Sequence, residues 1–586
     1  MSLLRRKTFA IFAAIVIVCI GLAASDARAQ TPTPTPQQTI TGVDLNNLKR
    51  VGIDSSETIT LSLDDAIRRA LENNNQIEVA RDDVRVAETR LRSLLGAYDP
   101  TFFVTPTYNR TAQNGAKPTN NFSVDLSGSQ LLKSGGRIQP FFNNSRSGSF
   151  FSTNANGATT QTTSSSALFY RSQMGVSFTQ PLLRNRSIDA TRRGIRVQRK
   201  SLQQTDAEFR RITIDIISQV QRAYWNLVFA LRDQQNRVAN LNLSRESMRQ
   251  VEAKIAAGTA APLQRAEVAT EVANREADLL VASQQVAIAD NSLKQLLLRD
   301  ATAPEWTKQI VPTDKPNFDM TPINLEDALA DARANRPELR RLKLQSEINQ
   351  IDIEYFRNQT KPQIDFTSSF SLNGFAQNFG AAASSFTTSP LLTTPTDLYL
   401  LSAINSIRPA GAPEITNPTV TVSNQPVASG GFGTSLRNLF NTNSPGFSVG
   451  VTIGFPLRNQ TAKADLAGAR FQEQQIQAQS RSQEQTVIVE VRNAVQAVET
   501  ARLRVLASRR ARENAEIQLQ GEQKLYEVGR STTFLLFQRE NALANARNAE
   551  IRAETDYNKA ISDLQRATST TFRANNIEVE SPMDDK

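Results

Sequence analysis

The sequence contains no histidine and only one cysteine, Cys19. Zinc sites with His or Cys ligands, Ser-His triads and intrachain disulfides are therefore excluded. Of the 586 residues 39% are apolar and 21% are charged, which excludes a polytopic helical membrane protein and a mostly disordered chain. We assign no catalytic, cofactor-binding or metal-binding residues and expect no enzyme activity. Function has to be inferred from the architecture.

The N-terminus carries the one long apolar run. Residues 8–24 follow three basic residues at 5–7, and Ala27-Arg28-Ala29 supplies small residues for cleavage. This pattern predicts a signal peptide over 1–29, with an uncleaved anchor helix as the alternative. Cleavage would remove Cys19, and a mature chain without cysteine suits an oxidising compartment.

Charge is scarce in two later segments. Residues 101–180 and 363–455 hold 12 of the 124 charged residues but 18 of the 28 phenylalanines. The rest is rich in Ala, Gln, Arg, Glu and Leu, which favour helix. Because the net charge of +10 is spread along an exported chain, we expect no nucleic-acid partner. Within the segment 30–60, residues 31–38 are TPTPTPQQ, which predicts an extended linker.

An internal duplication organises the chain. Leu63-Asp64-Asp65-Ala66 matches Leu325-Glu326-Asp327-Ala328 at a shift of 262 residues, and Gly258 matches Gly529 at a shift of 271. Ordered matches of this kind indicate two copies of one structural unit. The predicted organisation is a first repeat over 61–300, an equatorial linker over 301–322, a second repeat over 323–572 and a tail over 573–586.

Proline is absent from residues 187–257 and 462–528, where apolar residues recur at the spacing of a packed helical seam. A helix over residues 187–257 would be roughly 105 Å long. Gly258 and Gly529 then interrupt the pattern, which predicts the tips of two helical hairpins; a glycine tolerated within a continuous helix is the alternative. We expect each pair of shorter helices to lie end to end along the long one.

Alternating residues predict strands in the segments with little charge. Large apolar residues alternate with small or polar ones in both repeats, as in transmembrane β-strands; a soluble hairpin packed on the helices is the alternative. We expect β-hairpins at about 101–180 and 363–455, hence four strands per chain, with long external loops and a hint of an extra hairpin at 131–137. Predicted lipid-facing residues are Met174, Val176, Phe178, Val449, Val451 and Ile453. Four strands cannot close a barrel alone, so the chain must oligomerise.

This layout resembles the TolC-like family of outer-membrane efflux and secretion ducts. Specific resemblances are Ala223-Tyr224-Trp225-Asn226-Leu227, the run from Ala257 to Leu263, and Val528-Gly529-Arg530-Ser531-Thr532. The resemblance implies a mainly α protein with a β-barrel part, in which a homotrimer forms a 12-stranded barrel in outer-membrane lipid above a periplasmic helical tunnel. It also implies passive export, a periplasmic adaptor and an inner-membrane pump. A fibrous coiled-coil surface protein is the alternative.

The resemblance places two kinds of site at the hairpin ends. The adaptor would dock on Gly258, Thr259, Ala260, Gly529, Arg530 and Ser531. The best-known family members narrow the periplasmic mouth with acidic rings six and nine residues beyond the second glycine; here those positions are Leu535 and Gln538, and Gln264 follows the first tip. We therefore expect an apolar constriction in place of an acidic one. Alternatively, residues 534–537 all pack between helices.

Overall fold

The computed structural model describes residues 54–112, 118–152, 164–259, 261–379, 387–422, 429–441 and 444–579. The predicted signal peptide lies outside these residues, as do most of the 30–60 segment and the end of the tail. Two helices dominate the described part: α3 (Ala190–Ala256) has 67 residues and α9 (Gln460–Glu527) has 68. Within the described residues, none of the helices has both the length and the apolar character required to cross a lipid bilayer.

Each long helix belongs to a hairpin. Helix α3 turns back into α4 (Leu263–Leu297), and α9 turns back into α10 (Thr533–Thr568). Shorter helices precede the strands of each repeat: α1 (Leu63–Asn73) and α2 (Asn75–Leu95) in the first, and α5 (Leu325–Asn335) and α6 (Pro337–Gln359) in the second. The same order of elements thus occurs twice.

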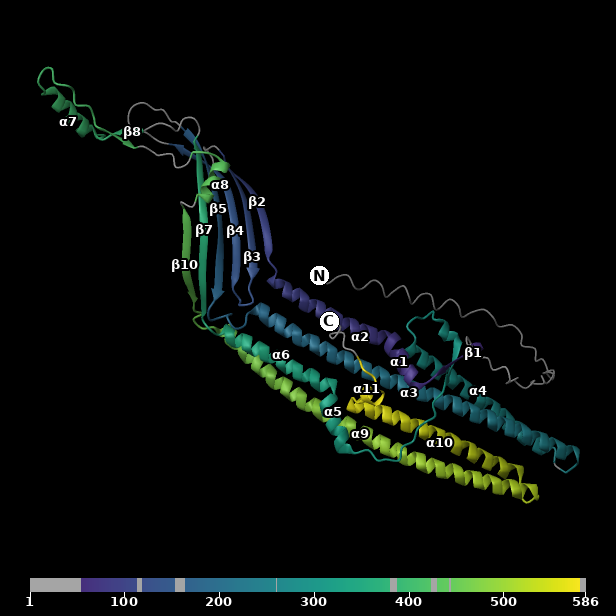
Figure 1. Cartoon of the computed structure of the whole chain (residues 1–586). Helices are drawn as coiled ribbons and strands as arrows, with labels where there is room; N and C mark the ends of the chain where they lie inside the picture. Colours follow the sequence, from purple (N-terminus) through teal and green to yellow (C-terminus); the bar gives the residue numbers. More distant parts are fainter. Residues whose placement is uncertain are drawn as a thin grey trace, which may run out of the picture. The chain divides into compact units, whose positions relative to one another are not determined.

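The helices form one layer (Figure 1). Near the strands the packing order is α2, α3, α6 and α9, and near the hairpin tips it is α4, α3, α10 and α9. Helices α2 and α4 therefore lie end to end along α3, and α6 and α10 along α9, as the helix lengths predicted. The core of the first repeat includes the fully buried Ile217, Tyr224 and Leu227 of α3.

In each repeat, two helices meet end to end, and one side chain at this joint caps the C-terminal end of the helix that returns from the hairpin tip. In the first repeat Asn74, between α1 and α2, donates its Nδ2 hydrogen to the carbonyl oxygen of Leu296 over 3.0 Å. In the second, Arg336, between α5 and α6, donates from Nε to the carbonyl oxygen of Ala567 over 2.7 Å. These residues are related by the shifts of 262 and 271, so the duplication is preserved in three dimensions.

The strands form an antiparallel six-stranded sheet in the order β10, β7, β5, β4, β3, β2. The mainly α fold with a sheet part is confirmed, but the sheet holds six strands where four were expected. The strands are β2 (Thr101–Thr111), β3 (Thr119–Leu131), β4 (Arg137–Ser152), β5 (Ser164–Pro181), β7 (Gln363–Phe379) and β10 (Pro445–Gly454).

The additional strands β3 and β4 occupy part of the expected external loop. Phe122, Val124 and Leu126 alternate with polar residues there, and this alternation suits a two-faced strand. Gly135 has a φ of +84° in the connecting turn, where glycine avoids the strain of a side chain. The amide of Leu132 donates to the carbonyl of Gly136 over 2.7 Å. The hint of an extra hairpin at 131–137 was therefore right.

Shorter elements connect these parts. Strand β1 (Asp54–Leu61) pairs in parallel with β6 (Lys308–Pro312), which lies in the predicted equatorial linker. The expected loop after β7 contains ordered elements of its own: β8 (Thr387–Pro390), α7 (Pro395–Ser406), β9 (Thr419–Val422) and α8 (Phe432–Phe440). Three short helices of about one turn also occur in the described residues: the 3-10 helices η2 (Gly96–Tyr98) and η3 (Pro304–Thr307), and α11 (Thr571–Ala574).

Candidate functional site

The six residues predicted to face lipid share one face of the sheet. Directly paired residues point to the same side, and the pairing runs from Val176 to Phe370 and on to Phe447. It also joins Phe178 through Ser368 to Val449. Met174, Val176 and Phe178 on β5 thus lie on the same side as Val449, Val451 and Ile453 on β10.

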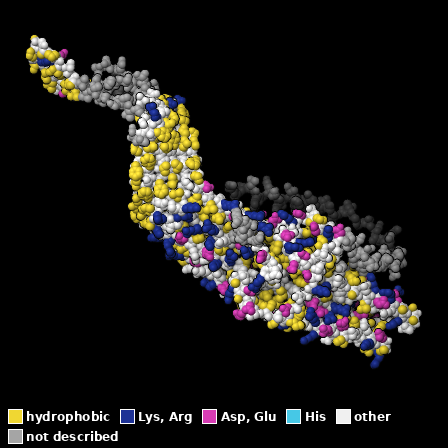
Figure 2. Space-filling view, in the orientation of Figure 1, with side chains coloured by type: hydrophobic (Ala, Val, Ile, Leu, Met, Phe, Trp, Pro, Cys, Tyr) yellow, Lys and Arg dark blue, Asp and Glu magenta, His cyan; other side chains and the backbone are white. Residues whose placement is uncertain are grey.

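This face is apolar and exposed in the single chain. The exposed fraction is 45% for Val176, 54% for Val451 and 74% for Phe447, and hydrophobic side chains cover the strands in Figure 2. The alternate residues, on the other face, are mostly small or polar: Ser123, Asp125, Gln173, Ser177, Asp365, Thr367, Ser369, Ser448 and Thr452. A wall between lipid and water requires this division.

The first hairpin tip has the hydrogen bonds of a Schellman motif. Gly258 adopts a φ of +71°, and its amide donates to the carbonyl of Ile255 over 2.9 Å. The amide of Thr259 donates to the carbonyl of Lys254, also over 2.9 Å. Helix α3 therefore ends where the sequence predicted a tip. Ala260, the third predicted docking residue here, lies outside the described residues.

The second tip repeats this geometry. Gly529 has a φ of +69°, and the amides of Gly529 and Arg530 donate to the carbonyls of Tyr526 and Leu525 over 3.1 and 2.9 Å. Ser531 donates its hydroxyl to Glu522. The two tips also meet: the ammonium nitrogen of Lys254 lies 4.1 Å from the ring centre of Tyr526 and 3.0 Å from its hydroxyl oxygen. This contact brings the ends of α3 and α9 together beside the two tips.

The expected constriction residues are partly accessible. Of residues 534–537, only Leu536 is buried, and it packs against Leu519 and Leu543. The side chain of Phe534 is 71% exposed and that of Leu535 is 38% exposed. Within the single chain, Phe534 and Leu535 are thus not packed between helices, whereas Leu536 is. Gln538 is exposed and Gln264 half-buried. Leu535 and Gln538 start an exposed stripe on α10 at helical spacing, which continues through Ala542, Asn545 and Ala549 without a carboxylate.

A partly buried carboxylate lies where α10 faces α4. Burial raises the pKa of Glu540 to about 7, the nearby Arg275 opposes this, and Glu271 adds to it. Arg275 is already paired with Glu271 over 2.5 Å, and the Nδ2 of Asn541 donates to Glu271 over 3.4 Å. Charge on Glu540 is therefore disfavoured at the contact between the two hairpins.

This carboxylate gives the hairpin contact a pH dependence. Since its folded pKa lies above the ordinary value of 4.5, folded Glu540 binds more protons, and its contribution to stability is lost as pH rises from about 4.5 to 7. We expect Glu540→Gln to flatten the fall in melting temperature between pH 5 and pH 8. Glu267→Gln, an exposed change on α4, is the control. If the melting temperatures of the parent and of Glu540→Gln fell equally between pH 5 and pH 8, the raised pKa of Glu540 would not be the cause of the pH dependence.

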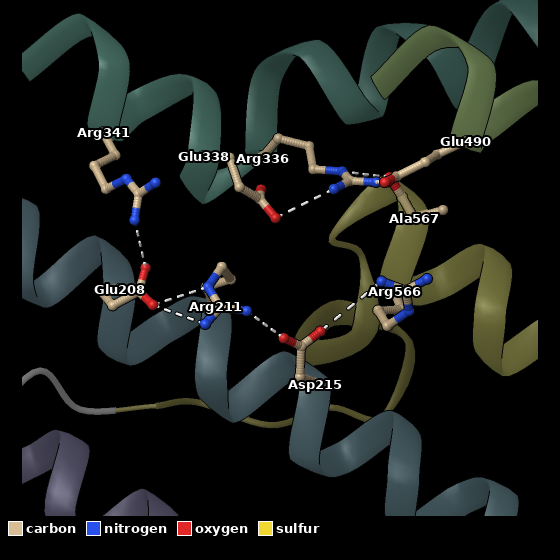
Figure 3. Close-up of polar contacts among 9 residues, drawn as sticks. All are labelled: Glu208, Arg211, Asp215, Arg336, Glu338, Arg341, Glu490, Arg566 and Ala567. Atoms are coloured by element: carbon tan, nitrogen blue, oxygen red, sulfur yellow. Dashed lines mark hydrogen bonds and ion pairs between the residues drawn. The ribbon is translucent and has the colours of Figure 1, made fainter. Parts of the chain in front are cut away.

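A buried polar junction ties helices of the second repeat together (Figure 3). Arg336, with 4% of its side chain exposed, pairs with Glu490 of α9 and, over 3.2 Å, with Glu338 of α6. Its third bond is the cap on Ala567 of α10. One guanidinium thus ties the joint between α5 and α6 to the middle of α9 and to the C-terminal end of α10.

A second chain of ion pairs continues this junction to α3. Arg211 pairs with Glu208 over 2.7 Å and with Asp215 over 2.6 Å. The hydrogen bond from Arg211 is the main cause that lowers the pKa of Glu208, and Arg341 also contributes. Burial raises the pKa of Asp215, opposed by Arg211 and Arg566. The ion pairs therefore hold α3 to both α6 and α10.

The equatorial linker is fixed by Tyr224 of the Ala-Tyr-Trp-Asn-Leu run. Its hydroxyl donates to Asp314 over 2.6 Å and lies 3.2 Å from the carbonyl of Leu61, and burial with the Asp314 bond raises its pKa. Lys294, fully buried, pairs with Asp290 over 2.8 Å and donates to the carbonyl of Trp306. Our sequence analysis missed these roles; the run containing Tyr224 was the available signal.

The same fold occurs in several solved channels. The outer-membrane protein VceC from Vibrio cholerae is 14% identical with a TM-score of 0.54, covering 86% of this chain and 95% of its own. The CmeC outer-membrane channel of Campylobacter jejuni is 13% identical with a TM-score of 0.55, covering 88% and 90%. The open MtrE outer-membrane channel of Neisseria gonorrhoeae is 15% identical with a TM-score of 0.55, covering 86% and 88%.

The family comparison agrees with the structural one. Residues 413–570, which include most of the second repeat, match the model of the outer membrane efflux protein family. A search of curated proteins found no match. The chain has the fold of outer-membrane channels. Its fold is therefore similar to that of these channels, and residues 413–570 are similar to the outer membrane efflux protein family.

Proposed function

We propose that this protein is the outer-membrane exit duct of a tripartite efflux or type I secretion system. The observation that carries the proposal is the two-faced sheet joined directly to helices of 67 and 68 residues. An apolar band fits the bilayer, and long paired helices fit the periplasm. Transport through such a duct is passive, with energy supplied elsewhere. The sheet disfavours the fibrous coiled-coil alternative, because a fibre needs no such apolar band.

The working form of this duct is a homotrimer in the outer membrane. A single six-stranded sheet is too small to close and has two edges that lipid does not tolerate. The predicted signal peptide over 1–29 would deliver the chain to the periplasm. Four helices abreast in each chain would give three chains a ring of twelve.

The periplasmic adaptor would dock on the two hairpin tips and link the duct to an inner-membrane pump. Gly258, Thr259, Gly529 and Arg530 are exposed, Ser531 is half-buried, and the Lys254–Tyr526 contact joins the two tips. Both tips have the same cap geometry, so one adaptor motif could bind each in turn.

Fractionation and efflux measurements test this function. Expressed with a cognate adaptor and pump in cells that lack their own exit channel, the protein should restore dye efflux. It should also migrate as a detergent-resistant trimer from the outer-membrane fraction. A monomer in the soluble fraction, with no efflux, would contradict the proposal.

The neutral stripe on α10 predicts how the entrance restricts flow. If Leu535 narrows the lumen, Leu535→Asp places three carboxylates in a ring there, and single-channel conductance becomes sensitive to divalent cations. Phe534→Asp, which adds the same charge outside the stripe, should leave the channel insensitive. An unchanged cation response in Leu535→Asp would place this residue away from the lumen.

A further inference from the structure

The sheet ends in two unpaired edges. Among the described strands, β2 pairs only with β3 and β10 pairs only with β7. The two edge strands have similar lengths, 11 residues in β2 and 10 in β10. In hydrocarbon each free edge would leave a row of backbone groups without hydrogen-bond partners. Something must cover both edges.

The two edges are complementary to each other. All neighbouring strands are antiparallel, and with six strands the first and last therefore run in opposite directions. Strand β10 of one copy can then pair with β2 of the next in the same antiparallel manner. A second copy of this chain is the partner that satisfies both edges at once.

The apolar face continues across such a joint. The pairing places Phe102 and Val104 of β2 on the same face as Phe447 and Val449 of β10. These side chains are exposed by 74%, 65%, 74% and 54% in the single chain. Joining the edges therefore extends one apolar band around the assembly and keeps the polar face inside.

The width of the sheet matches the width of the helical layer. Strands about 4.8 Å apart and tilted by about 40° occupy roughly 38 Å for six strands. Four helices at about 9–10 Å occupy roughly 36–40 Å. A four-stranded sheet would occupy only about 25 Å, so the barrel would be narrower than the helical ring below it.

From these observations we infer that β3 and β4 are part of the barrel wall, and that three copies close an 18-stranded barrel through β10 of one copy and β2 of the next. The number of copies rests on the proposed trimeric duct. The perimeter of this barrel is about 113 Å, against about 75 Å for twelve strands. Its cross-section is thus roughly twice as large, and the barrel does not narrow the exit.

Cysteine cross-linking tests the joint, since the predicted mature chain has no cysteine of its own. Val451→Cys on β10 is combined in turn with Phe102→Cys, Val104→Cys, Pro106→Cys or Tyr108→Cys on β2, because barrel shear sets the register. We expect oxidised dimers and trimers from at least one combination and monomers from every single variant. Monomers from all four combinations would overturn the inference.

A second measurement tests whether β3 and β4 belong to the wall. Asp125 lies on the polar face of β3 and Leu126, 40% exposed, on the apolar face. In an 18-stranded barrel, a charged water-soluble thiol reagent should react with Asp125→Cys and lower single-channel conductance. Leu126→Cys should react only with a lipid-soluble maleimide. The cysteine-free parent should be unaffected by either reagent.

The outcomes separate this inference from the proposed function. If the charged reagent labels both cysteines without changing conductance, the β3–β4 hairpin lies outside a smaller barrel. That result would overturn the inference and leave efflux and trimer formation intact. A protein that neither trimerises nor restores efflux would overturn both.

Discussion

Replacing Gly258 and Gly529 together by valine is expected to weaken adaptor docking and to abolish most efflux. Both glycines adopt a positive φ, +71° and +69°, which costs a residue with a side chain about 1–2 kcal/mol. A penalty of that size at each tip corresponds to a roughly 5- to 30-fold weaker equilibrium. Adaptor cross-linking yield and dye efflux in whole cells are the measurements.

The effect should come from the backbone and not from crowding. A Cβ built on either glycine meets no atom within 4 Å, so valine would fit if the backbone allowed it. Asparagine tolerates the left-handed conformation, and Gly258→Asn with Gly529→Asn is the matched control, expected to keep docking and efflux. Normal efflux and adaptor cross-linking in the double valine variant would refute docking at the tips.

These tips were predictable because a local rule decides them. A glycine that ends a long helical pattern satisfies the last carbonyls of the helix at low steric cost, and both copies of the repeat carry it. The long helices were equally accessible, since they contain no proline and keep one apolar spacing throughout. The hairpin ends and the helix order could thus be read from residue type and spacing alone.

The strand number was harder to predict. The segment of β3 and β4 contains many Ser, Thr and Asn residues, which also favour loops. Phe122, Val124 and Leu126 alternate with polar residues, but only the structure shows that this segment pairs with β4, with Leu126 opposite Phe142. Pairing partners are distant in sequence, so no local pattern fixes how many strands join one wall.

The buried junction around Arg336 was missed for a similar reason. Arg336 is a charged residue before a proline, and in the sequence it resembles a solvated helix end. The duplication held a signal, because Arg336 is the equivalent of Asn74, but the residue type differs between the repeats. Only the packed structure shows that both side chains cap the returning helix, at Leu296 and at Ala567.

The junction yields the largest expected effect on stability. Arg336→Met removes a guanidinium that is 4% exposed and leaves Glu490, Glu338 and the carbonyl of Ala567 without their partner. Loss of one partner from a buried pair is worth about 3–5 kcal/mol. We expect a loss near 3 kcal/mol, because Glu490 is 41% exposed and can be hydrated. Thermal loss of the helical circular dichroism signal of the purified trimer measures it.

A neighbouring arginine supplies the matched control. Arg341 lies on α6, close to Arg336, and pairs with Glu208, but its side chain is 51% exposed, and surface pairs contribute about 0–1 kcal/mol. Arg341→Met should therefore melt close to the parent, and Arg336→Lys should fall between, because lysine keeps the charge but not the planar set of donors. Equal melting temperatures for Arg336→Met and Arg341→Met would show that the buried junction does not stabilise the second repeat, and that the packing of α6 and α10 against α9 is sufficient without it.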